Sequence, residues 1–212
     1  MKKLLFWMVL IVGIVVLLGS CAKKDDETTA ASTSVTSTTA SGSITVGSET
    51  LSGTYVSACN TTQFAAAAGT QFFPSDVKSG KTVIVVTSDT TFSDEMLMYT
   101  DTSCSTPTSY TKNGNTSVTV GVASGSNYLV TYNSSTYKVN AYTAVAETHL
   151  EAYLLAATGS AVALTVGTES SFSDSGSLYM NLWSVTSTTI ETGNGDKNTQ
   201  PTAMDSMVMT KE

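Results

Sequence analysis

The chain has 212 residues, enough for one domain with an additional tail, and its formal net charge is −7. All ten basic residues are lysines, and His149 is the single histidine. This composition argues against nucleic-acid binding, which needs a basic surface and favours arginine. It also excludes a metal site built from several histidines of one chain. We therefore expect no nucleic-acid partner, no metal and no cofactor.

Residues 1–20 have the layout of a secretory signal peptide, with two lysines ahead of an apolar run from Leu4 to Leu18. The run leads into Leu-Gly-Ser-Cys, which ends at Cys21. This pattern resembles the lipobox of bacterial lipoproteins and implies cleavage before Cys21 and acylation of that residue. Several acyl chains would hold the protein stably on a membrane. The alternative is an uncleaved helix, at the short end of the roughly 17–25 residues that span a bilayer.

Residues 21–43 form the expected tether. After Cys21 this stretch is rich in Ser and Thr, and its one large apolar side chain is Val35. It cannot bury enough surface to offset its ordering entropy, so we expect disorder. Ala22, in place of Asp, favours the outer membrane by analogy with the sorting rule of enteric bacteria. One folded domain is then predicted over 44–212.

Cys59 and Cys104 are the two cysteines that remain after Cys21. An exported protein passes through an oxidising compartment, where such a pair predicts one disulfide. The chain-entropy model assigns the loop that it would close roughly 4 kcal/mol. Two free thiols are the alternative.

Most of the folded domain consists of short segments with β patterning, separated by turns rich in Gly, Asn, Ser and Thr. Apolar and polar residues alternate in many of them, as in a strand with one buried face. The expected strands cover 51–58, 82–88, 95–100, 116–122, 127–132, 137–143, 177–183, 188–192 and 206–210. This series predicts a mainly β fold, an antiparallel up-and-down barrel of about eight or nine strands.

Two segments have helical features instead. Residues 145–157 place Leu150, Tyr153 and Leu154 at helical spacing, which predicts an amphipathic helix of about three turns. Residues 63–68 could form a shorter helix between strands.

Several motifs recur in a particular order along the domain. Gly53-Thr54-Tyr55 resembles the G-x-W signature that opens lipocalin barrels, with tyrosine in place of tryptophan. The longer series is GTYVSAC ending at Cys59, YTDTSC ending at Cys104, Tyr137-Lys138-Val139 ahead of Thr148-His149, and QPTAMD ending at Asp205. This series is similar to a family of uncharacterised proteobacterial lipoproteins. The resemblance implies a lipocalin-like barrel and the Cys59–Cys104 bridge, and it implies no established activity.

His149 lies between Glu147 and Glu151 and is the one imidazole that could serve a hydrolase. The sequence has no G-x-S-x-G elbow, however. A histidine that caps or bridges the start of a helix is the better interpretation, so we expect no enzymatic activity.

Tyr128, Tyr132 and Tyr137 are the candidate ligand-binding residues. We expect them on neighbouring strands, facing the same side of the sheet. In 177–183 the leucines share one face, and Tyr179 and Trp183 share the other. The interior of a closed eight-stranded barrel is either filled by side chains or holds one small ligand.

The sequence therefore predicts a lipid-anchored lipoprotein of the bacterial envelope with a non-enzymatic barrel. Two functions compete. An open, apolar lumen of a few hundred Å³ would favour binding of a small apolar ligand or lipid. A filled barrel with an exposed apolar patch or a bare edge strand would favour a structural or protein-interaction module.

Overall fold

The structure, which is a computed structural model, describes residues 36–174, 176–193 and 196–212. The predicted signal peptide 1–20, the lipid-attachment residue Cys21 and the tether up to residue 35 lie outside these residues. The helices are α2 (Thr62–Ala67) and α3 (Ala144–Thr158). The strands are β1 (Ile44–Val46), β2 (Glu49–Leu51), β3 (Thr54–Ser57), β4 (Ser79–Val86), β5 (Phe92–Tyr99), β6 (Pro107–Ser124), β7 (Asn127–Ala141), β8 (Ser170–Ser173), β9 (Leu178–Val185), β10 (Thr189–Gly193), β11 (Asp196–Lys197) and β12 (Met204–Lys211).

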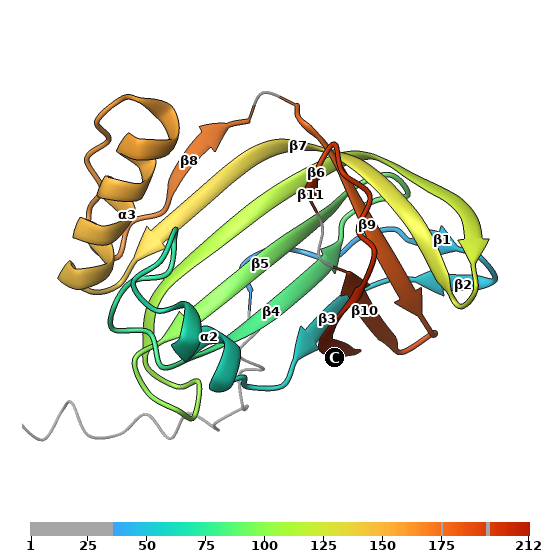
Figure 1. Ribbon diagram of the computed structural model, residues 1–212, viewed down its shortest axis with the longest axis horizontal. Helices are drawn as coiled ribbons and strands as arrows, with labels where there is room; N and C mark the ends of the chain where they lie inside the picture. The colour runs from blue at the N-terminus through green and yellow to red at the C-terminus, as the bar shows by residue number, and fades with distance from the viewer. Residues whose placement is uncertain (1–35, 175, 194–195) are drawn as a thin grey trace, which may run out of the picture. The chain divides into compact units, whose positions relative to one another are not determined.

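Eight of these strands form a closed antiparallel barrel (Figure 1). In order around the wall they are β3, β4, β5, β6, β7, β9, β10 and β12. The ring closes because β7 pairs with β9 and β12 pairs with β3. Strands that follow one another in this series are neighbours in space, so the predicted up-and-down barrel is confirmed. The short strands β8 and β11 extend the sheet beside β7 and β9.

Different segments cover the two ends of the barrel, as Figure 1 shows. At one end the β1–β2 hairpin packs Ile44, Val46 and Leu51 against inward-facing residues of the wall, in what we call the hairpin cluster. At the other end Phe64 of α2 lies over Gly80, where an added Cβ would be only 2.0 Å from the ring. Glycine at this position therefore lets α2 approach the wall closely.

Helix α3 follows β7 and confirms the predicted helix. Thr143 caps it, because the side-chain oxygen accepts a hydrogen bond from Ala146 N at 3.1 Å. Gly159 ends it in a left-handed conformation. Leu150 and Leu154 are buried against the end of β7, forming the α3 cluster. In the part of the chain that the structure describes, neither helix is long and apolar enough to span a bilayer.

The β6–β7 hairpin is much longer than the sequence predicted, with strands of 18 and 15 residues. Two strands were expected where β7 runs, and both are parts of it. An extra residue, Ser135, separates the parts, because Ser134 and Thr136 pair with the adjacent residues Asn115 and Gly114 of β6. This bulge shifts the alternation of side-chain direction by one position. Side chains of even-numbered residues before Ser135 and of odd-numbered residues after it therefore face the same side of the sheet.

Residues 36–43, which we call the outer segment, run along the outside of the barrel. Thr38 donates a hydrogen bond to Glu95 of β5 at 2.5 Å, and Ser41 N donates to the carbonyl of Val86 at 3.0 Å. Ala40 packs on the apolar outer cluster of β4 and β5. The sequence assigned this stretch to the tether because it lacks large apolar residues, yet its hydroxyl groups find partners on the wall.

Candidate functional site

The barrel encloses a partly open cavity of about 460 Å³, which we call the lumen. Its wall on the hairpin side is aromatic. Phe92 meets Tyr132 and Trp183 edge to face, with ring centroids 4.9 and 5.2 Å apart. Such contacts hold aromatic rings in defined positions, so this wall is preformed.

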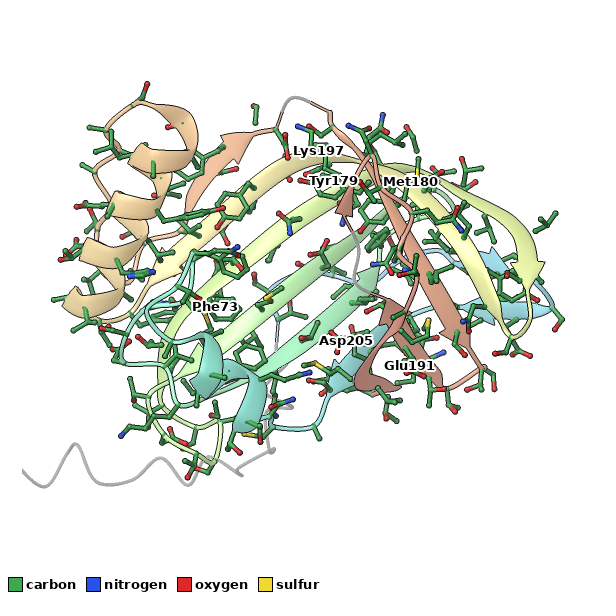
Figure 2. All side chains as sticks on the ribbon, in the orientation of Figure 1. Phe73, Tyr179, Met180, Glu191, Lys197 and Asp205 are labelled. Atoms are coloured by element: carbon green, nitrogen blue, oxygen red, sulfur yellow. A yellow bond between two sulfur atoms is a disulfide. The ribbon has the colours of Figure 1, made fainter. Side chains whose placement is uncertain are left out.

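The wall toward α2 is built from two methionines and a phenylalanine. Met96, Met207 and Phe72 line it. Tyr179 of β9 and Asp205 of β12, both labelled in Figure 2, also contribute to the lining. Methionine side chains adapt their shape to what they contact. The lumen therefore has one rigid apolar side and one adaptable apolar side.

A polar group lies between these walls, where β5 and β6 pair. Asp94 is directly opposite Asn113, and Phe92 is opposite Asn115, so all four side chains share the inner face. The Asp94 carboxylate accepts hydrogen bonds from Asn113 at 2.8 Å and from Asn115 at 2.5 Å. Burial raises the pKa of Asp94, and the two asparagine amides only partly oppose this shift.

Tyr132 extends this polar group across the lumen. Burial raises the pKa of its hydroxyl, the nearby charge of Asp94 adds to the shift, and a hydrogen bond with Asn181 opposes it. The Asn181 side-chain oxygen accepts from Gly193 N at 2.9 Å, which turns its amide nitrogen toward other partners. The lumen thus combines an apolar body with a few oriented polar groups, as small-molecule sites do.

The structure brings one of the three candidate tyrosines, Tyr132, into the lining of the lumen. Tyr128 packs in the hairpin cluster, where a Cβ on Gly47 would lie 2.0 Å from its hydroxyl. Tyr137 faces inward but packs in the α3 cluster, with its ring centroid 6.5 Å from that of Phe172. All three lie on β7, where Tyr128 and Tyr137 are about 30 Å apart at roughly 3.3 Å per residue. From the sequence we expected these tyrosines on neighbouring strands. Because they occupy one strand, they are spread along its length and do not form one site.

Sequence reasoning missed Asp94 and its two asparagines. The signal was present: Phe92, Asp94 and Met96 alternate along β5, which places one carboxylate on an apolar face. The sequence placed Trp183 on the face of its strand opposite the leucines, without deciding whether that face is inside the barrel. Trp183 is 1% exposed and lies inside the barrel.

The predicted disulfide between Cys59 and Cys104 is present, with Cα atoms 5.8 Å apart. It joins the segment after β3 to the loop after β5.

His149 lies on α3, and its Nε2 is 2.7 Å from the carbonyl oxygen of Gln71. Because a carbonyl only accepts, the imidazole donates here and ties α3 to the loop after α2.

Comparisons with known proteins add no further assignment. No protein-family model matches the chain, and no curated protein matches it significantly. Among the described residues, no three His, Cys, Asp or Glu side chains are grouped closely enough to hold a metal ion. The chemistry of the lumen is therefore the basis on which a function can be argued.

Proposed function

We propose that this protein is an exported, lipid-anchored envelope lipoprotein whose barrel binds one small, largely apolar molecule in its lumen. The observation that carries the binding role is the 460 Å³ cavity with its aromatic wall. This volume falls within the range of about 300–1,000 Å³ typical of small-molecule sites. The anchor rests on the lipobox-like residues that end at Cys21.

A structural or protein-interaction role has less support. Each of the eight wall strands pairs with a neighbour on both sides over part of its length, and β6 has a bare stretch after Asn115, where its pairing with β5 ends. Several of the exposed large apolar residues lie on different elements, such as Val122 on β6 and Val208 on β12, whereas Val145 and Leu155 are both on α3. The cavity, by contrast, is a single space with a defined wall.

Ligand binding is tested with residues 36–212, which belong to one compact unit. The domain would be produced in an oxidising compartment and titrated with the neutral apolar dye N-phenyl-1-naphthylamine. Native mass spectrometry of the same sample would detect small molecules that copurify. We expect stoichiometric dye binding or a retained apolar compound.

Two threonine variants show whether the lumen is the site. Thr82→Phe fills the lumen from β4, whereas Thr119→Phe adds the same ring to the exposed side of β6. We expect the first to abolish dye binding and the second to leave it unchanged. Binding that survives Thr82→Phe in a folded variant would reject the lumen as the ligand site.

The anchor is tested separately in a bacterial host. Wild-type protein should incorporate labelled palmitate, and Cys21→Ser should not. Unchanged labelling of Cys21→Ser would reject acylation at this residue.

A further inference from the structure

The charges that line the lumen have one sign. Asp94 and Asp205 contribute carboxylates, and the described residues of the lining include no lysine and no histidine. The lysines of the neighbouring wall strands lie on the outer face, where Lys112 pairs with Glu95 and Lys138 pairs with Glu169. A molecule that enters the lumen therefore meets negative charge without a compensating cation from these lining residues.

Asp94 has unused capacity to accept hydrogen bonds. An ionised carboxylate offers about four acceptor positions. The amides of Asn113 and Asn115 supply one donor to each oxygen and hold the carboxylate in a fixed orientation. These amides are neutral, so they orient the charge without cancelling it. A charged donor on a ligand would therefore form a charge-assisted hydrogen bond in a site of low dielectric constant.

The aromatic wall lies directly beside this carboxylate. Phe92 is two residues from Asp94 on the same face of β5, and the charge of Asp94 acts on the Tyr132 hydroxyl. Aromatic faces also attract cations held within about 6 Å. The lumen can therefore hold a ligand whose flat apolar group contacts the aromatic wall and whose cationic group lies beside Asp94.

We propose that the lumen selects a small amine with an apolar ring, whose ammonium group binds Asp94 and whose ring packs against the wall formed by Phe92, Tyr132 and Trp183. This inference rests on the proposed function, because it requires the lumen to be a ligand site. It goes further by fixing the charge of the ligand. Fatty acids and other carboxylates are disfavoured, since their charge would lie against Asp94 in a poorly solvated space.

Three probes that share one skeleton test the charge preference: 2-phenylethylamine, 2-phenylethanol and 3-phenylpropanoate. They are a cation, a neutral molecule and an anion at pH 7.5. Each would be titrated calorimetrically into the full-length protein in phosphatidylcholine nanodiscs, with empty nanodiscs as the blank. We expect the amine to bind at least about tenfold more tightly than the alcohol, in keeping with a hydrogen bond to a charged group. The carboxylate should show no measurable binding.

Two asparagine variants assign the preference to one residue. Asp94→Asn keeps the shape of the side chain and removes its charge. It should lower amine affinity about tenfold or more while alcohol affinity changes less than twofold. Asp89→Asn removes the same charge from the exposed turn between β4 and β5 and should change neither affinity. Circular dichroism would establish that both variants are folded.

The outcomes separate this inference from the proposed function. If the alcohol binds in the lumen and the amine binds no better, or if Asp94→Asn leaves the amine affinity unchanged, the charge preference is overturned and the ligand site stands. If none of the three probes binds and the neutral dye also fails to bind, the ligand site itself is overturned.

Discussion

Asp94 and Glu95 are adjacent carboxylates on β5, and they have opposite surroundings. Glu95 faces outward, is 1% exposed and lies 3.6 Å from Lys112 Nζ. It also accepts hydrogen bonds from Thr38 at 2.5 Å and from Ser93 at 3.0 Å. Asp94 faces the lumen and has two neutral amides as side-chain partners.

The difference shows how the two faces of one wall serve different purposes. On the outside, the chain supplies a cation and hydroxyl donors to its own carboxylate and covers them with the outer segment. Inside, the chain orients a carboxylate and leaves its charge uncompensated next to a cavity. A buried ion pair of the first kind is structural, whereas a carboxylate of the second kind is available to a ligand.

The largest effect should come from removing the cation on the outer face. Lys112→Met leaves Glu95 buried without its charged partner, which should lower the free energy of unfolding by about 3–5 kcal/mol. Urea denaturation at neutral pH measures this change. The combined variant Glu95→Gln with Lys112→Met should recover most of the loss, because no unpaired charge remains.

Lys138→Met is the matched control for that experiment. Its pair with Glu169 is also on the outer face, but the two side chains are 35% and 30% exposed. Such a pair contributes at most about 1 kcal/mol. Equal losses for the two lysine variants would mean that burial does not distinguish the two pairs.

The next largest effect should come from the disulfide. The Cys59–Cys104 bridge spans 45 positions of sequence, so its removal restores freedom to a long loop of the unfolded chain. Replacing both cysteines with alanine should lower the free energy of unfolding by about 2–4 kcal/mol. Because the bridge lies outside the lumen, amine affinity should not change. A mass 2 Da above the oxidised value after reduction would verify that the bridge had formed.

A smaller effect should come from the outer segment. Thr38→Val removes a donor from the buried Glu95 carboxylate, and hydrogen bonds to charged groups contribute about 1.5–3 kcal/mol. Thr39→Val, an exposed neighbour in the same segment, should have almost no effect. If the two variants denature at the same urea concentration, the contact between Thr38 and Glu95 does not stabilise the protein.

The smallest effect, and one of opposite sign, should come from Asp94→Asn. Burial raises the pKa of Asp94 in the folded protein, so the folded state holds its proton more tightly than the unfolded state. This contribution to stability is present at low pH and is lost as pH rises through the folded-state pKa. At neutral pH the variant should therefore be slightly more stable than wild type.

A pH series sharpens this prediction. The advantage of Asp94→Asn over wild type should shrink as pH falls from neutral through the raised pKa of Asp94. Hydrogen bonds led by that from Ser103 lower the pKa of Asp101, which makes both proteins less stable in acid. The difference in stability between the two proteins is therefore the informative quantity. An advantage that stays constant with pH would contradict a buried, titrating Asp94.

Local patterns predicted much of the barrel because they reflect short-range rules. The spacing of Leu150 and Leu154 and the Gly159 stop define α3, the dense β-branched residues define β4, and the apolar alternation defines β7. The predictions failed at irregular positions. Val122, in the expected strand 116–122, is 90% exposed beside a register shift in β6.

The sequence by itself determined the strand series, the helix near 145–157 and the cysteine pair, because each depends on spacing along the chain. Tertiary structure alone decided which face of each strand became the lumen. Both faces of this wall are partly buried, the inner one by the aromatic cluster and the outer one by the outer segment. Alternation in the sequence therefore shows that a strand has two faces but does not show which of them lines the lumen. Closure of β7 onto β9 then placed Asp94 inside and Glu95 outside, a choice that no local pattern contains.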